Sequence, residues 1–184
     1  MTLSNETYTI QCDVLTQPPL DAFDIVHNTE AADTSDFYMA RTFQITRKDG
    51  HSLYIALLDR LCSDSDHYAV LAGHTLTVIL FAAIVRIDVN TGAILQYEPC
   101  ENMGGLYEIH PIEDGYILYG ESEVFRYDRA LHRLWEFSGR DILVSLKHSP
   151  SFRLEENEIH VRDFLGWHYV LNLNGILLNE FSEV

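Results

Sequence analysis

A short pattern that recurs three times constrains the fold of this chain more than any other feature. Each copy is an apolar strand that ends in Asp or Asn, followed by a turn and a second apolar strand. The polar residues are Asp88, Asp128 and Asn172, which lie 40 and 44 positions apart. Four-stranded propeller blades repeat at a similar period of about 40–50 residues. The pattern therefore predicts a series of similar sheet units, an architecture that usually serves as a scaffold for binding.

Turn signals between apolar runs indicate antiparallel hairpins along the rest of the chain. Asp49-Gly50 and Asp114-Gly115 each separate two strand-like runs, and residues 7–15 alternate between apolar and polar side chains. The acidic stretch 21–36 is weakly patterned and is expected to be a loop or a short irregular helix. No linker divides the chain, so we expect one domain over residues 1–184. Residues 1–67 would form a divergent N-terminal sheet unit, and residues 68–184 three hairpin repeats.

Two segments have an alternative interpretation. Residues 69–85 carry no charge, and this length is close to the lower limit of about 17–25 residues for a membrane-spanning helix. The Gly73-His74 pair, the alternating threonines and the lack of flanking Lys/Arg clusters favour buried strands with a bend near Ala82-Ala83. In residues 128–137 the spacing of Leu131, Leu134 and Trp135 also fits a helix, but the repeat context favours a strand.

The first copy of the repeat is similar to a known family. Residues 84–95 read Ile-Val-Arg-Ile-Asp-Val-Asn-Thr-Gly-Ala-Ile-Leu, which resembles the strand–Asp–turn–Gly–strand core of quinoprotein-type β-propeller repeats. Looser matches extend the resemblance over residues 68–181. It implies an all-β fold of antiparallel hairpin repeats, forming a small four-bladed or partial, open β-propeller-like domain. The cofactor ligands of the enzymes in that family have no counterpart here, so the resemblance implies a scaffold and no cofactor.

The charge of the chain indicates the chemistry of its partners. There are 28 acidic and 12 basic residues, a formal net charge of −16, and the first basic residue is Arg41. Such a surface repels nucleic acid and anionic lipid, since both require Lys and Arg to displace counterions. It attracts basic proteins in a salt-dependent way. We therefore predict a basic protein partner, no nucleic acid and no membrane, although solubility alone also explains an acidic surface.

The cysteines and the N-terminus indicate the compartment. Cys12, Cys62 and Cys100 are odd in number, widely spaced and without a CxxC pair, so neither a disulfide framework nor a structural zinc site is expected. Cys12 falls on the apolar face of the alternating segment, where it would be a buried small side chain. The first residues show no signal peptide. These observations favour a cytoplasmic protein.

No motif indicates catalysis, a metal site or a cofactor site. The nine histidines are scattered, without a metal-binding spacing or a nucleophile elbow. The acidic segment 64–67 lacks the Gly and Glu of a calcium loop, and a solvated turn explains it better. His160 and His168 lie on neighbouring predicted strands and would meet across a hairpin, but the expected alternation with Arg162 makes them surface residues.

We therefore predict a non-enzymatic acidic protein-binding module. Its most specific form is an immunity or inhibitor protein for a basic toxin or nuclease, by analogy of charge and size. The residues predicted to bind the partner are the clustered loop carboxylates, Asp33, Asp36, Asp64, Asp66, Glu155, Glu156 and Glu158.

Two alternatives belong to other functional classes. The first is a small-molecule-binding or hydrolytic enzyme with a pocket at the hub of the sheets. The second is a structural module that self-associates, as a homodimer for example, through unpaired strand edges such as Ile176–Phe181. The aromatic residues that would line the hub pocket are Tyr107, Tyr119, Tyr127, Trp135 and Trp167.

Overall fold

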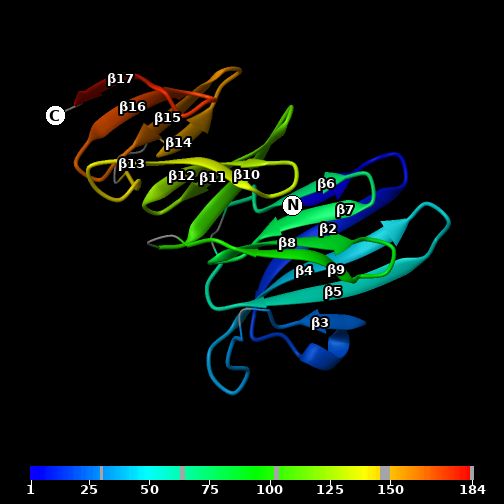
Figure 1. The fold of residues 1–184 in the computed structure, drawn as a ribbon. Helices are drawn as coiled ribbons and strands as arrows, with labels where there is room; N and C mark the ends of the chain where they lie inside the picture. The colour runs from blue at the N-terminus through cyan, green and yellow to red at the C-terminus, as the bar shows by residue number, and fades with distance from the viewer. Residues whose placement is uncertain (30, 63–64, 102–103, 146–149, 183–184) are drawn as a thin grey trace. The chain divides into compact units, whose positions relative to one another are not determined.

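The computed structural model describes residues 1–29, 31–62, 65–101, 104–145 and 150–182. The chain forms two compact units, Met1–Cys100 and Glu101–Val184, and each unit contains two β-sheets. The described residues contain no α-helix and only one short 3-10 helix, η1 (Leu20–Ala22). The predicted all-β fold is confirmed (Figure 1).

The first sheet has five strands and the order β1-β2-β4-β5-β3. All of its pairs are antiparallel except β3 with β5, which is parallel. The acidic stretch 21–36, predicted to be a loop or a short irregular helix, contains β3 and most of η1. The short helix agrees with that prediction, whereas the strand was not predicted. The strands are β1 (Thr2–Ser4), β2 (Tyr8–Thr16), β3 (Ile25–His27), β4 (Met39–Arg47) and β5 (Ser52–Asp59).

The alternation in the sequence explains the burial of the first sheet. Tyr8, Ile10 and Cys12 of β2 are buried while Thr9 and Gln11 between them are exposed. Cys12 is a free thiol whose pKa is raised to about 12, chiefly by burial, so it behaves as the predicted small apolar side chain. The hairpin between β4 and β5 turns at Gly50, whose φ of 89° is accessible to glycine at little cost.

The second sheet completes the first unit and contains the uncharged segment. Its strands pair antiparallel in chain order, and residues 69–85 form its first two strands and the start of its third. No described helix is long and apolar enough to cross a bilayer. The buried-strand interpretation is therefore confirmed, although there are three strands where two were expected. They are β6 (Ala69–Ala72), β7 (Thr75–Ile79), β8 (Ala83–Asp88) and β9 (Ile94–Pro99).

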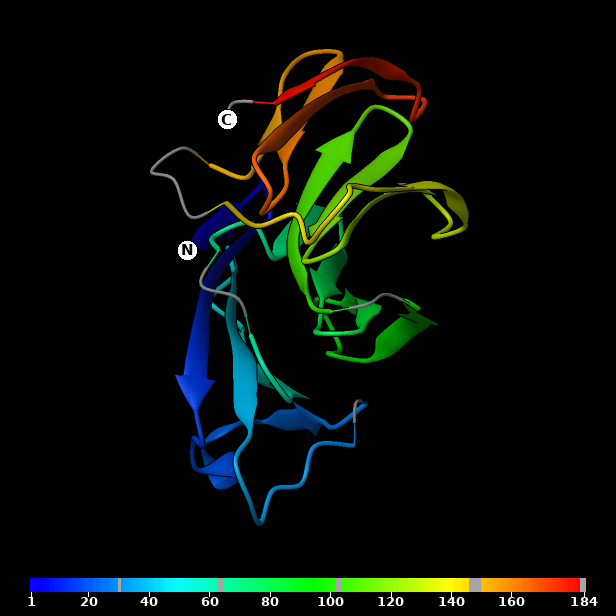
Figure 2. The ribbon, with the colours of Figure 1, turned by 90° about the vertical axis from the view of Figure 1, so that its left-hand side faces the viewer.

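The second unit contains two more antiparallel sheets, each with four strands in chain order. Figure 2 shows the last strand, in red, along one edge of its sheet. The third sheet consists of β10 (Leu106–Ile112), β11 (Gly115–Gly120), β12 (Glu123–Asp128) and β13 (Arg133–Ser138). The fourth consists of β14 (Phe152–Leu154), β15 (Glu158–Arg162), β16 (Trp167–Asn172) and β17 (Leu177–Ser182).

The three recurring segments occupy the same place in the second, third and fourth sheets. Asp88, Asp128 and Asn172 each end the third strand of their sheet. Each of these sheets also has a register shift between its third and fourth strands at the same distance before the polar residue. A four-stranded antiparallel meander repeated in this way is the organisation of propeller blades. The sheets are open, and no described strand joins one sheet to another.

The bulge at each register shift leaves one leucine on the fourth strand without a partner. The three leucines are Leu95, Leu134 and Leu178, and they are 56%, 54% and 53% exposed. A bulge increases the local twist of a strand and interrupts its regular pairing. Because the bulge lies at the same position in all three sheets, these sheets share one structural plan.

The segment with a helical alternative forms a strand. Residues 133–138 are β13, which confirms the strand prediction. Leu131 does not belong to that strand, however, since it lies in the preceding turn with a φ of 66° and is fully buried. The corresponding turns carry Gly92 and Gly175 at φ of 71° and 78°. Leu131 therefore adopts a backbone conformation that favours glycine, and the burial of its side chain stabilises that conformation.

The two units have different cores. The second unit packs apolar residues of its two sheets into one cluster that includes Ile117, Val124, Ile159 and Leu171. The first unit buries a charged pair, since Arg41 and Asp59 are both fully inaccessible and their Nε and Oδ2 atoms lie 3.8 Å apart. The Arg41 guanidinium also lies 4.5 Å from the centre of the Tyr68 ring. Its nitrogens make no hydrogen bond, so charge attraction and the aromatic ring stabilise it.

Candidate binding groove

The hairpin turns of the third and fourth sheets line a groove of about 1020 Å³ that is open to solvent. All of its residues belong to the second unit. Except for Arg126, which lies within β12, they come from the turns that join the first strand to the second and the third strand to the fourth, and from the strand ends beside those turns. The lining residues are Ile112, Glu113, Asp114, Arg126, Asp128, Arg129, Ala130, Asn157, Asn172, Leu173 and Asn174.

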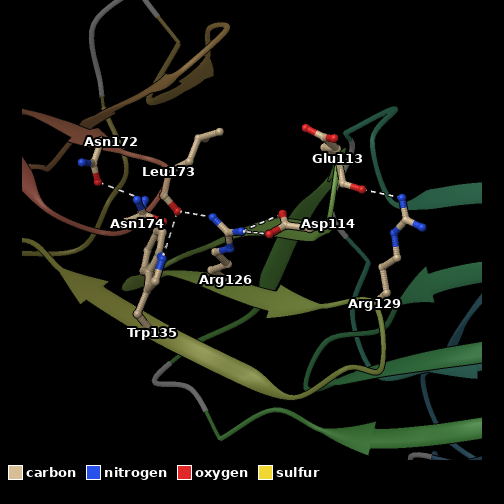
Figure 3. Close-up of polar contacts among 8 residues, drawn as sticks. All are labelled: Glu113, Asp114, Arg126, Arg129, Trp135, Asn172, Leu173 and Asn174. Carbon is tan, nitrogen blue, oxygen red and sulfur yellow. Dashed lines mark hydrogen bonds and ion pairs between the residues drawn. The ribbon is translucent and has the colours of Figure 1, made fainter.

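Arg126 joins the two sides of the groove (Figure 3). Its Nη2 donates to both carboxylate oxygens of Asp114 at 2.7 and 2.6 Å, and its Nη1 donates to the Leu173 carbonyl. Trp135 Nε1 donates to the same carbonyl at 3.2 Å. The guanidinium is buried, while the Asp114 side chain is 68% exposed. The arginine charge is therefore neutralised inside the groove, and the carboxylate that neutralises it still faces solvent.

A glycine allows the two sheets to approach at this point. A Cβ on Gly175 would lie 2.7 Å from Cδ2 of Trp135, too close for any other residue to be accommodated without a shift. The φ of 78° at Gly175 is also a backbone conformation that glycine adopts more easily than residues with a side chain. Gly175 thus explains how the Trp135 indole reaches the turn that carries Leu173.

The repeated polar residues hold the turns that form the groove. Asp128 Oδ1 accepts hydrogen bonds from the N–H groups of Ala130 and His132, both at 2.8 Å. Asn172 Oδ1 accepts from the N–H groups of Asn174 and Ile176, both at 3.0 Å. The bond from His132 lowers the pKa of the Asp128 carboxyl, so it is ionised at neutral pH. These side chains fix backbone geometry, as Asx turns do, and present negative charge and amide groups to the groove.

The groove has the chemistry of a polar binding surface. Glu113 and Asp114 are exposed carboxylates, and Arg129 donates to the backbone carbonyl of Glu113. Asn157 adds an amide from the turn that also carries Glu155 and Glu156. An ionised, turn-capping Asp128 is unsuited to act as a general acid, because it has no proton to give at neutral pH. The arrangement offers acceptors to a cationic or amide-bearing ligand.

The predicted partner-binding carboxylates are divided between the two units. In the first unit Asp33 and Asp36 share an exposed turn, in which the N–H of Asp36 donates to the Asp33 carbonyl at 3.2 Å. Asp66 is exposed beside a small hollow that also includes Asp13 and Tyr68. Asp64 lies outside the described residues.

The other predicted carboxylates belong to the second unit. Glu155 and Glu156 lie in the exposed turn between β14 and β15, and Glu158 begins β15. Their turn continues directly into Asn157, which lines the groove. The sequence pattern thus identified one acidic turn beside the groove but did not reveal Glu113 and Asp114, two of the three carboxylates in its lining. The Asp-Gly turn signal at residues 114–115 was the available clue.

The aromatic residues proposed for a hub pocket contribute to packing. Tyr119 is buried, donates its hydroxyl to the Leu143 carbonyl, and has its pKa raised to about 12, chiefly by burial. Tyr127 is buried as well, and the Arg140 guanidinium lies 3.5 Å from the centre of the Trp167 ring. Tyr107 and Trp135 pack against the core of the second unit. None of the five belongs to the groove lining.

His160 and His168 do meet, as their predicted strands suggested. His160 Nδ1 and His168 Nε2 lie 3.3 Å apart on neighbouring strands β15 and β16. Their exposure differs from the expectation of surface residues, because His168 is buried and the His160 side chain is only 15% exposed.

Comparisons with known proteins describe the fold and not the activity. No family model and no curated protein matches the chain. Among solved structures, the chain is similar to the computationally designed Ika8 protein, with a TM-score of 0.53 and 10% identity. It is also similar to BamB from Moraxella catarrhalis, with a TM-score of 0.47 and 14% identity. Each comparison covers 79% of this chain and 46% of the other, so the chain spans about half the length of these structures.

The class of protein that follows is an all-β protein with a propeller-like repeat of antiparallel sheets. This class is defined by the three equivalent four-stranded meanders. The likeness to the designed Ika8 protein agrees with it at the level of fold alone.

Proposed function

We propose that this protein is a non-enzymatic module that binds a basic protein partner, and that the groove of the second unit receives the partner's cationic side chains. The observation that carries this proposal is the groove itself, where the exposed carboxylates of Glu113 and Asp114 line a wide, open surface beside the acidic turn 155–156. Its most specific form is an immunity or inhibitor protein for a basic toxin or nuclease.

Internal pairing of the basic residues supports the proposal. Arg126 is neutralised by Asp114, as described above. Arg133 pairs with Glu136 and Arg140 with Glu180, at 2.9 and 3.1 Å. With 28 acidic and 12 basic residues in the chain, such pairs leave a surplus of carboxylates to face a partner. A surface of this kind increases the rate of encounter with a basic protein and favours it over acidic competitors.

The openness of the groove favours a protein partner over a small molecule. Small-molecule sites usually enclose about 70–90% of the ligand surface. This groove is open, and its charged and amide side chains are spread over separate turns and strands beside Ile112, Ala130 and Leu173. Such a surface fits the polar parts of protein interfaces, where charge complementarity sets specificity.

We infer that the repeat is of the quinoprotein type and serves as a scaffold without a cofactor; the Asp88 cap of the turn at Asn90 and Thr91 supports this. We also infer a cytoplasmic location, supported by three buried cysteines whose thiols are not joined in disulfides.

The test compares two pairs of substitutions that remove the same charge. An arginine-rich peptide serves as the probe, and its affinity is measured by calorimetry at several salt concentrations. We expect Glu113→Gln with Glu156→Gln to weaken binding about fivefold or more, because these carboxylates lie at or beside the groove. The control pair, Glu6→Gln with Asp21→Asn, removes two exposed carboxylates of the first unit that are not among the predicted partner-binding residues, and should change binding less than about twofold. Affinity should also fall as salt rises.

Equal losses in the two pairs would overturn the assignment of the groove, because the peptide would then respond to net charge alone. Binding that is insensitive to salt would overturn the electrostatic basis of the proposal.

A further inference from the structure

A second cluster of polar side chains lies on β15 and the turn before it. Carboxylate oxygens of Glu155 and Glu158 and a ring nitrogen of His160 all lie within 4.8 Å of one another. Strand alternation explains part of this arrangement, since residues 158 and 160 are two apart and project from the same face of β15. Glu155 reaches the same point from the turn.

The spacing between His160 Nε2 and each of the two carboxylate oxygens matches neighbouring ligands of a tetrahedral metal site. His160 Nε2 lies 3.3 Å from Glu158 Oε2 and 3.4 Å from Glu155 Oε2. Zinc binds nitrogen and carboxylate oxygen at about 2.0–2.2 Å with tetrahedral angles, which separates neighbouring ligand atoms by about 3.3–3.6 Å. Magnesium prefers octahedral oxygen ligands at about 2.0–2.1 Å, which separates neighbours by about 3 Å, and calcium prefers oxygen ligands only.

The contacts of His160 Nε2 are also compatible with metal ligation. This atom is buried and makes no hydrogen bond, although two carboxylate oxygens lie near it. Both distances are longer than the usual N–H···O separation of about 2.9–3.0 Å. The two oxygens thus flank the nitrogen without either one accepting a hydrogen bond from it. A metal ion bound to the nitrogen and to both oxygens would satisfy all three atoms together.

Neighbouring groups orient two of the ligands. His168 Nε2 lies 3.3 Å from His160 Nδ1 and can accept a hydrogen bond from its N–H, which leaves the lone pair of His160 Nε2 available to bind a metal. Arg153 Nε lies 2.9 Å from Oε1 of Glu155, so the other oxygen of that carboxylate is the one directed at His160. Outer contacts of this kind are common around metal ligands and raise affinity.

We propose that Glu155, Glu158 and His160 form a binding site for one divalent transition-metal ion, Zn²⁺ by geometry, with His168 as a positioning residue. The three protein ligands leave the fourth tetrahedral position to water. The site requires no partner protein, so it goes beyond the proposed function. The sequence did not indicate it, because Glu155 enters from a turn and no standard ligand spacing results.

The experiment uses the full chain, freed of metal with a chelator, and titrates Zn²⁺ by calorimetry. We expect one ion per chain, and a loss of affinity of about tenfold or more in Glu158→Gln and in His160→Gln. Glu156→Gln is the matched control, since it removes the same charge from the same turn outside the cluster, and should change affinity less than about twofold. His168→Gln should weaken binding about tenfold while leaving the ligands in place.

A spectroscopic measurement separates a built site from general attraction to an acidic surface. Substitution with Co²⁺ should give the strong visible absorption of tetrahedral coordination in the wild type and lose it in Glu158→Gln, whose fold is checked by circular dichroism. Equal weakening in Glu156→Gln and Glu158→Gln would overturn the proposal, and so would octahedral Co²⁺ absorption in the wild type. The arginine-rich peptide test depends on Glu113 and Glu156, so the two proposals can fail separately.

Discussion

At the residue scale, one polar side chain in each repeat builds the turn that follows it. Asp88 Oδ1 accepts from the N–H groups of Asn90 and Thr91, and Asp128 and Asn172 do the same for their own turns. The sequence could identify these residues because an Asx turn depends only on local backbone. It could not distinguish the turn of Leu131 from a strand, since the burial that holds its positive φ comes from distant residues.

The ionised caps predict a loss of stability in acid. Partial burial acts to raise the pKa of Asp88, but the hydrogen bonds from Thr91 and Asn90 outweigh it and lower the pKa below 3.8. The pKa of Asp128 is lowered as well. A group whose pKa is lower in the folded state stabilises the fold above its unfolded pKa, and this contribution disappears as pH falls through the folded value. Wild-type stability should therefore decrease as the pH falls below about 4.

Asn keeps the acceptor at both positions but does not titrate. Denaturant midpoints measured against pH should therefore fall less steeply in Asp88→Asn with Asp128→Asn than in the wild type. Asn172→Asp is the reciprocal variant and should make the acid dependence steeper. Identical pH profiles in all three proteins would contradict the role of these carboxyls in acid stability.

At the element scale, the fourth strand of each repeat is an edge, and the last one is the most apolar. Strand β17 pairs only with β16, and all its residues are exposed. Leu177, Leu178 and Phe181 are among them, whereas the described residues of β13 expose one large apolar side chain, Leu134. Exposed apolar edges favour pairing with another chain, so the self-association that the sequence suggested stays a prediction with a definite location.

That prediction concerns concentration-dependent association. Sedimentation velocity should show dimers of the wild type at high protein concentration, and Leu178→Lys should shift the protein towards monomers, because a charged residue on an edge opposes pairing. Leu134→Lys, at the equivalent bulge of the third sheet, is the control and should leave association unchanged. A wild type that remains monomeric at all concentrations would rule out the β17 edge as an interface.

At the scale of the whole molecule, the net charge of −16 opposes compact folding through self-repulsion. Exposed ion pairs such as Arg47–Asp49 contribute little by comparison and are also screened by salt. The screening length falls from about 30 Å at 0.01 M salt to about 8 Å at 0.15 M, which weakens the repulsion between distant carboxylates most.

Thermal stability should therefore rise as sodium chloride is added over this range. Scanning calorimetry at fixed pH measures the effect, and Glu101→Lys with Glu136→Lys, both exposed, should reduce the dependence on salt. A melting temperature that falls with added salt would show that local ion pairs outweigh the repulsion.

The sequence by itself determined the hairpin repeat, the all-β class and the repeated polar position at Asp88, Asp128 and Asn172, because strand alternation and turn signals depend on residues close together in the chain. Tertiary structure alone decided where the turns of the third and fourth sheets meet. The parallel pairing of β3 with β5, the groove at Arg126 and Asp114, and the cluster of Glu155, Glu158 and His160 arise from side chains brought together by the turns and strand register. Register sets which side chains become neighbours, and it follows from the packing of whole sheets and not from local sequence.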